Sequence, residues 1–264
     1  GTGALNDIYP VTDLLTGLHD AGIETNDELS KFYTDYCSTR PSVGMAQQDW
    51  TLPEPNVSLY TDEMMANAKA YSDTAMVVIT RVGGEGADLP SGENGTSDSW
   101  ISGQEGDGNY LALSAEEIEL LQNLKALKDN GTFKNIIVLI NSSNAIELDF
   151  LNPEICGEDY GIDAAMWIGD VGQTGINGVG QLLSGAVTPS GSLVDTYLYD
   201  NMANPAMYNF YTQAYPNAAE YNLLTEGADV QGMYSVYQEG IYLGYRYFET
   251  RYEDVVMGTA KAGD

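Results

Sequence analysis

The chain has few of the residues that build metal, redox and disulfide sites. Two cysteines, Cys37 and Cys156, are too few for a disulfide framework. His19 is the single histidine, so we expect no Cys/His zinc site and read His19 as a surface or cap residue of a helix. Acidic residues between 88 and 107 match no EF-hand spacing. The sequence therefore predicts no metal and no cofactor.

Basic residues and long apolar runs are also scarce. Ten Lys and Arg stand against 39 Asp and Glu, which gives a net charge of −29. This balance argues against nucleic acid and anionic lipid as partners, and it suits an extracellular or cell-surface protein or simply a highly soluble one. No apolar run approaches the roughly 18 residues of a membrane-spanning helix. The chain begins at Gly1 rather than Met, so we expect a piece of a longer protein with any targeting segment upstream.

What the sequence does contain is an alternation of short apolar runs with helical patterns. The runs expected as strands are 75–80, 136–140, 164–168 and 192–197. The expected helices lie around 11–21, 28–37, 61–71, 114–129 and 175–185. Continuous apolar strands are typical of a parallel sheet buried on both faces. We predict a doubly wound α/β sandwich, one domain over 1–264, with an irregular Tyr- and Asn-rich excursion at about 198–240.

A glycine-rich loop follows the first of these strands. The loop begins at Arg81 and contains Gly84, Glu85 and Gly86, Asp88 lies just beyond, and the polar stretch continues to about residue 110. Glycines let the backbone approach a ligand closely, and loops at strand ends often carry chemistry. Glu85 can therefore be a general acid/base, a role that needs a carboxyl within reach of a leaving oxygen. The other interpretation is a turn with a solvated acid.

A second glycine-rich turn lies at 172–180, before a predicted helix. Such a turn can hold a phosphate at a helix N-terminus. This one has neither the Gly-x-Gly-x-x-Gly spacing nor the Gly-Lys-Ser/Thr ending of phosphate-binding loops. We therefore favour close packing of helix on strand, and a nucleotide-binding protein is the least favoured class.

Four motifs in order resemble a known family. They are Gly-Glu-Gly-x-Asp at 84–88, Gly-Gln-x-Gly at 172–175, Pro-Ser-Gly-Ser-Leu at 189–193 and Tyr-x-Glu-Gly-Ile-Tyr-Leu-Gly-Tyr-Arg-Tyr at 237–247. Together they are similar to the α/β-sandwich domain of glycoside hydrolase family 3, the β-glucosidase type. The resemblance covers nearly the whole chain.

The resemblance implies a retaining β-glucosidase whose general acid/base is Glu85. It implies substrate contacts around that loop from Arg81, Gly84, Gly86 and Asp88, with Asp88 positioning the loop. The family's nucleophile, an aspartate, belongs to a separate (β/α)₈ barrel, and we do not assign it to Asp49.

The implied partners are a β-glucoside and that barrel, and the order of motifs is similar to the subgroup in which this domain precedes the barrel. This chain alone would then lack the nucleophile and be inactive. The alternative is a non-catalytic carbohydrate-binding or structural α/β domain.

Overall fold

The computed structural model describes residues 10–39, 54–81, 110–209, 213–217, 220, 233–234 and 236–259. Contacts divide the chain into two compact units, Gly1–Tyr199 and Asp200–Asp264. The single domain over 1–264 stays a prediction, and each unit is described here by itself.

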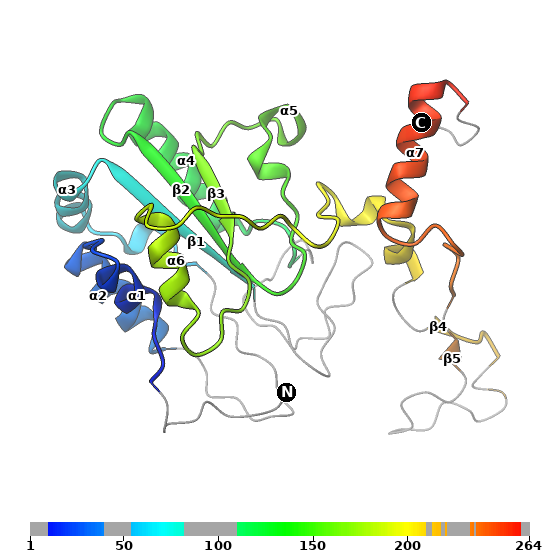
Figure 1. Ribbon diagram of the computed structural model, residues 1–264, viewed down its shortest axis with the longest axis horizontal. Coiled ribbons are helices and arrows are strands. Elements are labelled where there is room, and N and C mark those ends of the chain that lie inside the picture. Colours follow the sequence, from blue (N-terminus) through cyan, green and yellow to red (C-terminus); the bar gives the residue numbers. More distant parts are fainter. Residues whose placement is uncertain are drawn as a thin grey trace. The chain divides into compact units, whose positions relative to one another are not determined.

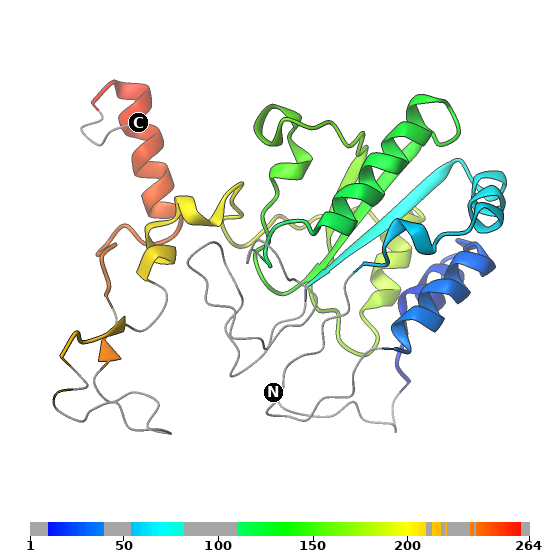
Figure 2. The ribbon, with the colours of Figure 1, turned by 180° about the vertical axis from the view of Figure 1, so that it is seen from behind.

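The first unit is built on a parallel sheet with helices on both faces (Figures 1 and 2). Its strands are β1 (Thr74–Arg81), β2 (Asn135–Ser142) and β3 (Ala164–Trp167), in the order β1-β2-β3. Both pairings are parallel, with Val77 opposite Val138 and Leu139 opposite Met166. This confirms the predicted α/β class and three of the four predicted strands.

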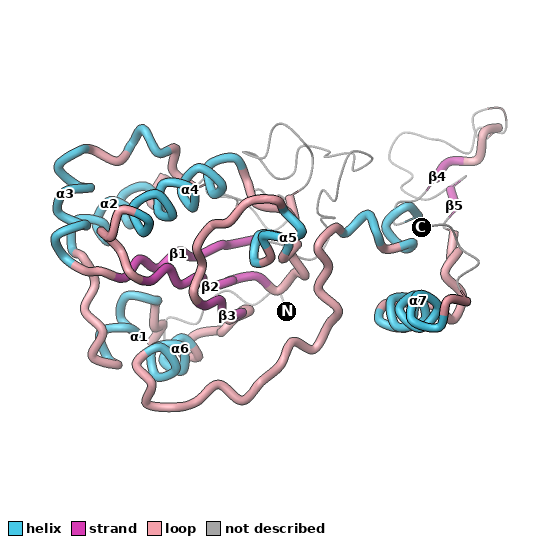
Figure 3. The backbone as a smooth tube through the Cα atoms, turned by 90° about the horizontal axis from the view of Figure 1, so that it is seen from above, coloured by secondary structure: helices cyan, strands magenta, loops and turns pink. Residues whose placement is uncertain are grey.

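Alternate residues of the central strands pack against different helices. Val77, Ile79 and Val138 face α4 (Ala115–Asp129), where they form a core with Leu121 and Leu124. On the other face, Leu139 packs with residues of α6 (Ile176–Leu183), and α1 (Leu14–Asp20) lies against α6. Figure 3 shows α4 on one side of the sheet and α1 with α6 on the other. Side chains alternate between the two faces along each strand, so the sheet has an apolar layer on each face.

Polar side chains cap the helices where the sequence predicts that they begin. Asp13 caps α1, Asn26 caps α2 (Asp27–Cys37) and Thr61 caps α3 (Asp62–Tyr71), each by accepting from a backbone N–H of the first turn. Ser114 and Glu117 form a capping box at the start of α4. A short helix, α5 (Pro153–Cys156), follows β2.

The predicted strand at 192–197 is wrong. These residues are described and contain no strand, and Leu193 and Val194 are 44% and 85% exposed. A strand forms only where its backbone groups find a partner, and the edge offered by β3 is four residues long. β-propensity alone does not supply that partner.

The second unit contains short 3₁₀ helices at 201–203 and 205–209, a two-stranded antiparallel sheet and one long helix. The sheet pairs β4 (Gln213–Ala214) with β5 (Met233–Tyr234), and the helix is α7 (Tyr245–Met257). No residue of α7 is buried in the structure. Among the described residues, no helix is both long and apolar enough to cross a membrane.

Candidate functional site

The predicted catalytic loop begins where β1 ends, at Arg81. Gly84, Glu85, Gly86 and Asp88 lie outside the described residues, so their roles stay predictions. The structure does describe Arg81 and the residues at which the chain returns from this loop, beginning at Tyr110. The candidate site is therefore built from these two ends.

The Arg81 guanidinium is buried and hydrogen-bonded to protein groups. Its side chain is 2% exposed, and Nη1 and Nη2 donate to the two carboxylate oxygens of Glu117 at 2.8 and 2.7 Å. Nε donates to the Tyr110 carbonyl at 2.6 Å and Nη2 to the Ala112 carbonyl at 2.5 Å. Nη1 also donates to the carbonyl of Thr80 at 2.8 Å. We call Arg81, Tyr110, Ala112 and Glu117 the Arg81 cluster.

The charge of Arg81 is neutralised inside the cluster. Burial lowers the pKa of Arg81, but the hydrogen bonds and the negative charge of Glu117 outweigh burial and leave that pKa above its ordinary value. The guanidinium also lies over the Tyr110 ring, 5.4 Å from the centroid. A direct contact of Arg81 with substrate stays a prediction. Such a contact would require one of the hydrogen bonds between Arg81 and the protein to break.

The sequence interpretation missed Glu117 as part of this site. Glu117 belongs to the capping box of α4, and its carboxylate accepts from Ser114 N at 2.8 Å and from Arg81. A buried arginine needs a carboxylate partner, but the sequence offers acidic residues at several helix starts, and only the packing of α4 against the sheet selects Glu117.

The neighbouring strands end in a second set of polar contacts. Trp167 ends β3, and its indole Nε1 donates to the Ser142 carbonyl at 2.8 Å. Asn141 donates from Nδ2 to the Gly169 carbonyl at 2.7 Å. Gly169 has a φ of 57°, and a Cβ there would lie 2.9 Å from the Trp167 ring. Both contacts fix the turns that leave this edge of the sheet.

The glycine-rich turn at 172–180 leads into a helix that packs closely on another helix, α1, whereas the favoured interpretation predicted packing of helix on strand. A Cβ at Gly180 would lie 2.1 Å from the Gly17 carbonyl oxygen, so α6 and α1 touch backbone to backbone. The start of α6 at Gly175 has no side-chain cap. Nothing at this turn in the structure favours a phosphate.

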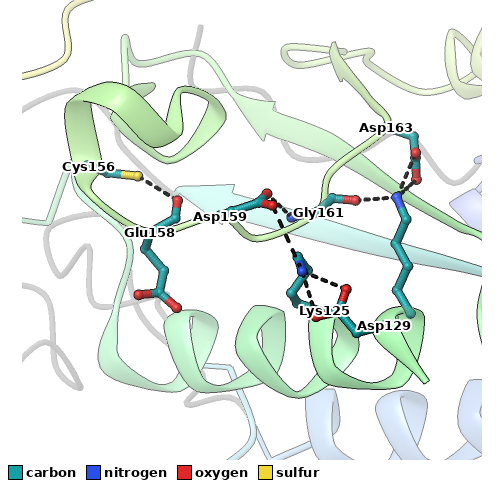
Figure 4. Close-up of polar contacts among 8 residues, drawn as sticks. Lys125, Asp129, Cys156, Glu158, Asp159, Gly161 and Asp163 are labelled. Carbon is teal, nitrogen blue, oxygen red and sulfur yellow. Dashed lines mark hydrogen bonds and ion pairs between the residues drawn. The ribbon is translucent and has the colours of Figure 1, made fainter.

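Ion pairs lie at the opposite end of the sheet, where the strands begin; we call this end the amino edge (Figure 4). Lys128, in the last turn of α4, donates to Asp163 and to the Gly161 carbonyl. Asp163 also accepts from Ile136 N at 2.7 Å, at the start of β2, and the lysine holds the pKa of Asp163 below its ordinary value. Lys125 pairs with Asp129 beside them. These contacts join α4 to the starts of β2 and β3.

No other described group suggests a binding site of a known type. The described residues contain no cluster of three or more His, Cys, Asp or Glu that could hold a metal. His19 is exposed and contacts Thr25, as expected for a surface residue. An open hollow of about 530 Å³ lies beside α7, and its described lining consists of Ile241, Tyr242, Arg246, Glu249, Thr250 and Glu253.

Comparison with known proteins identifies a family. The family model described as the glycosyl hydrolase family 3 C-terminal domain matches residues 2–245. A β-glucosidase from Ruminococcus albus is 29% identical over 97% of this chain and 22% of its own length. β-Glucosidase A from Butyrivibrio fibrisolvens is 27% identical over 95% of this chain and 27% of its own length. The chain thus spans about a quarter of these relatives.

Solved structures show the same fold. The structure of β-glucosidase 3B from Thermotoga neapolitana in complex with α-D-glucose superposes with a TM-score of 0.64 at 23% identity, over 98% of this chain and 30% of that one. A β-glucosidase from Paenibacillus barengoltzii gives a TM-score of 0.62 at 29% identity, over 91% of this chain and 22% of that one.

Proposed function

Because the chain belongs to the family of glycosyl hydrolase family 3 C-terminal domains, we propose that it is the acid/base-bearing domain of a retaining β-glucosidase. The family match over residues 2–245 carries this proposal. The named relatives are β-glucosidases, which supports a β-glucoside as the substrate class. Secretion or display at the cell surface is part of the proposal and is supported by the charge of −29.

The proposed catalytic group is Glu85. A retaining glycosidase uses two carboxyl groups about 5–5.5 Å apart, one as nucleophile and one as general acid/base. Glu85 follows a strand of a parallel sheet, in a sequence where glycines flank it on both sides. Parallel sheets characteristically bind ligands beyond the carboxyl ends of their strands. The nucleophile is assigned to a (β/α)₈ barrel elsewhere in the longer protein, and that partner supplies most of the sugar-binding surface.

The mechanism follows from the two protonation states of Glu85. In the first step its protonated carboxyl gives a proton to the glycosidic oxygen as the bond to the sugar breaks, and the barrel nucleophile forms the glycosyl-enzyme. In the second step the Glu85 carboxylate takes a proton from water, which attacks the sugar and releases the nucleophile. No metal or cofactor enters this proposal.

The test is Glu85→Ala in the enzyme that contains both domains. A general acid helps most when the leaving group is poor, so hydrolysis of alkyl glucosides should fall about 10²–10⁴-fold. Hydrolysis of an activated aryl glucoside should fall much less, and azide should partly restore its turnover by replacing water. Equal losses on both substrates without azide rescue would remove Glu85 from this role and favour a non-catalytic domain.

A further inference from the structure

We propose that Arg81 is a positioning residue for Glu85. Arg81 is the residue at which the Glu85-bearing segment leaves the sheet, and its guanidinium donates to Tyr110 and Ala112, where the chain returns. One side chain therefore fixes both ends of that segment. The inference rests on the proposed function for the role of Glu85. The contacts that carry it lie in described residues.

The first argument is the number of donors. An arginine has five N–H donors, and the five hydrogen bonds of Arg81 go to Thr80, Tyr110, Ala112 and the two oxygens of Glu117. With this guanidinium 2% exposed, a sugar hydroxyl could bind Arg81 only by displacing one of these acceptors. Arg81 therefore influences a substrate through the backbone that it holds.

The second argument is which backbone it holds. The accepting carbonyls of Tyr110 and Ala112 are 29 and 31 residues away in sequence, on the far side of the segment. The carbonyl between them, of Leu111, accepts from Glu147 N at 2.8 Å. Three successive carbonyls of the returning chain are thus bonded, two of them by Arg81. The same arginine ends β1, and three residues separate it from Glu85.

The third argument concerns charge. Glu117 is 8% exposed, and its carboxylate binds the guanidinium through both oxygens while closing the capping box of α4. Bidentate pairing fixes direction as well as distance, which a lysine ammonium cannot reproduce. The first turn of α4 therefore orients Arg81, and Arg81 in turn orients the returning chain.

The main variant is Arg81→Lys in the enzyme that contains both domains. Lysine keeps the charge opposite Glu117 but has three donors, so it cannot serve every acceptor. The double variant Arg81→Met/Glu117→Met removes the pair without leaving a buried charge, and it serves if the lysine variant does not fold. Lys128→Met is the matched control, because it removes an ion pair of the same helix at the amino edge of the sheet.

The first measurement separates the three roles open to Arg81. A misplaced acid should lower kcat on an alkyl glucoside about 100-fold and leave KM unchanged, with a small effect on an activated aryl glucoside. A higher KM on both substrates would mean that Arg81 binds sugar directly. An equal loss of kcat on both, matching the unfolded fraction, would mean a purely structural role. Either of these results overturns the proposal.

The second measurement does not depend on activity. The segment 82–109 contains Glu93 and Glu105 and no Lys or Arg, so a glutamate-specific protease can cut it where trypsin cannot. Arg81→Lys should raise the rate of cleavage after Glu93 and Glu105 at least several-fold, and Lys128→Met and Glu85→Gln should not. An unchanged rate in Arg81→Lys overturns the inference. If Glu85→Ala fails its own substrate test while this rate rises, the proposed function is wrong and the hold of Arg81 on the segment stands.

Discussion

At the scale of single residues, Glu54 is a described acid that accepts from two tyrosines while largely shielded from water. The phenol groups of Tyr33 and Tyr60 both donate to its Oε1, at 2.5 and 2.9 Å. Burial raises the pKa of Glu54, the negative charges of Glu117 and Glu116 raise it further, and the two phenol hydrogen bonds oppose this in part. The net pKa is above the ordinary value of a glutamate.

We expect this pKa to make stability depend on pH. A carboxyl with a folded pKa above its unfolded value binds its proton more tightly in the folded protein. Its stabilising contribution is therefore complete below the unfolded pKa of about 4.3 and is lost as pH rises through the folded pKa. Glu54→Gln does not titrate and keeps an oxygen acceptor. The free energy of unfolding of the wild type should fall relative to Glu54→Gln as pH rises from about 4 toward neutral.

Urea unfolding of both proteins at several pH values measures this difference. Tyr33→Phe provides the complementary variant: it removes a hydrogen bond that favours the carboxylate, so its loss of stability should extend to higher pH. A difference between wild type and Glu54→Gln that stays constant with pH would contradict the raised pKa.

The residues of the candidate site show what a sequence can reveal. Arg81 was recognisable because it follows a buried strand and precedes a glycine-rich loop. Its ion-pair partner was not, because Glu117 is 36 residues away and its place beside Arg81 depends on how α4 packs against the sheet. Motifs locate residue types along the chain, and tertiary packing decides which of them meet.

At the scale of elements, the contact between α1 and α6 depends on two glycines. A Cβ at Gly180 would lie 2.1 Å from the Gly17 carbonyl oxygen, and a Cβ at Gly17 would lie 3.0 Å from the carbonyl oxygen of Ile176. These are backbone atoms, which cannot rotate away as a flexible side chain can. The two helices must therefore separate to accept a larger residue at either position.

Gly180→Ala should destabilise the first unit by about 1–3 kcal/mol, the usual cost of overpacking. Gly178→Ala is the matched control in the same helix, because a Cβ there meets nothing within 4 Å. That change should raise stability by about 0.5–1 kcal/mol, since alanine favours a helix over glycine. Thermal unfolding of the two variants measures these effects. Equal shifts in Tm for both variants would show that the helices do not touch as described.

The elements that were predicted correctly share a local cause. The strands β1 and β2 are continuous apolar runs, and α4 begins at a capping box and carries a periodic apolar face. The strand predicted at 192–197 failed because pairing is not a local property. The long helix α7 was missed because its apolar residues Val255, Val256 and Met257 are exposed and follow no buried face.

At the scale of the whole molecule, this chain corresponds to about a quarter of its relatives, with 22% and 27% of their lengths covered. Retaining hydrolysis needs a nucleophile opposite the acid/base, and catalytic groups that act as a unit contribute little separately. Of the two aspartates in this chain considered as nucleophile, Asp88 is only three positions from Glu85, and Asp49 lies in a proline-rich connection. Neither has the sequence context of a nucleophile, so we propose that the second carboxyl comes from another domain.

We therefore expect the purified 264-residue chain to show no measurable hydrolysis of an aryl β-glucoside. Adding the barrel domain as a second polypeptide should restore turnover, and barrel plus Glu85→Ala chain should show the azide-dependent activity expected when the acid/base is missing. Asp49→Ala and Asp88→Ala chains distinguish the alternatives. Turnover by the chain alone that either substitution abolishes would place both carboxyls in this chain. Hydrolysis by the mixture of this chain and the barrel requires the barrel nucleophile and Glu85 to lie on opposite sides of one sugar. The turnover of the mixture therefore measures whether the two domains share a single active site.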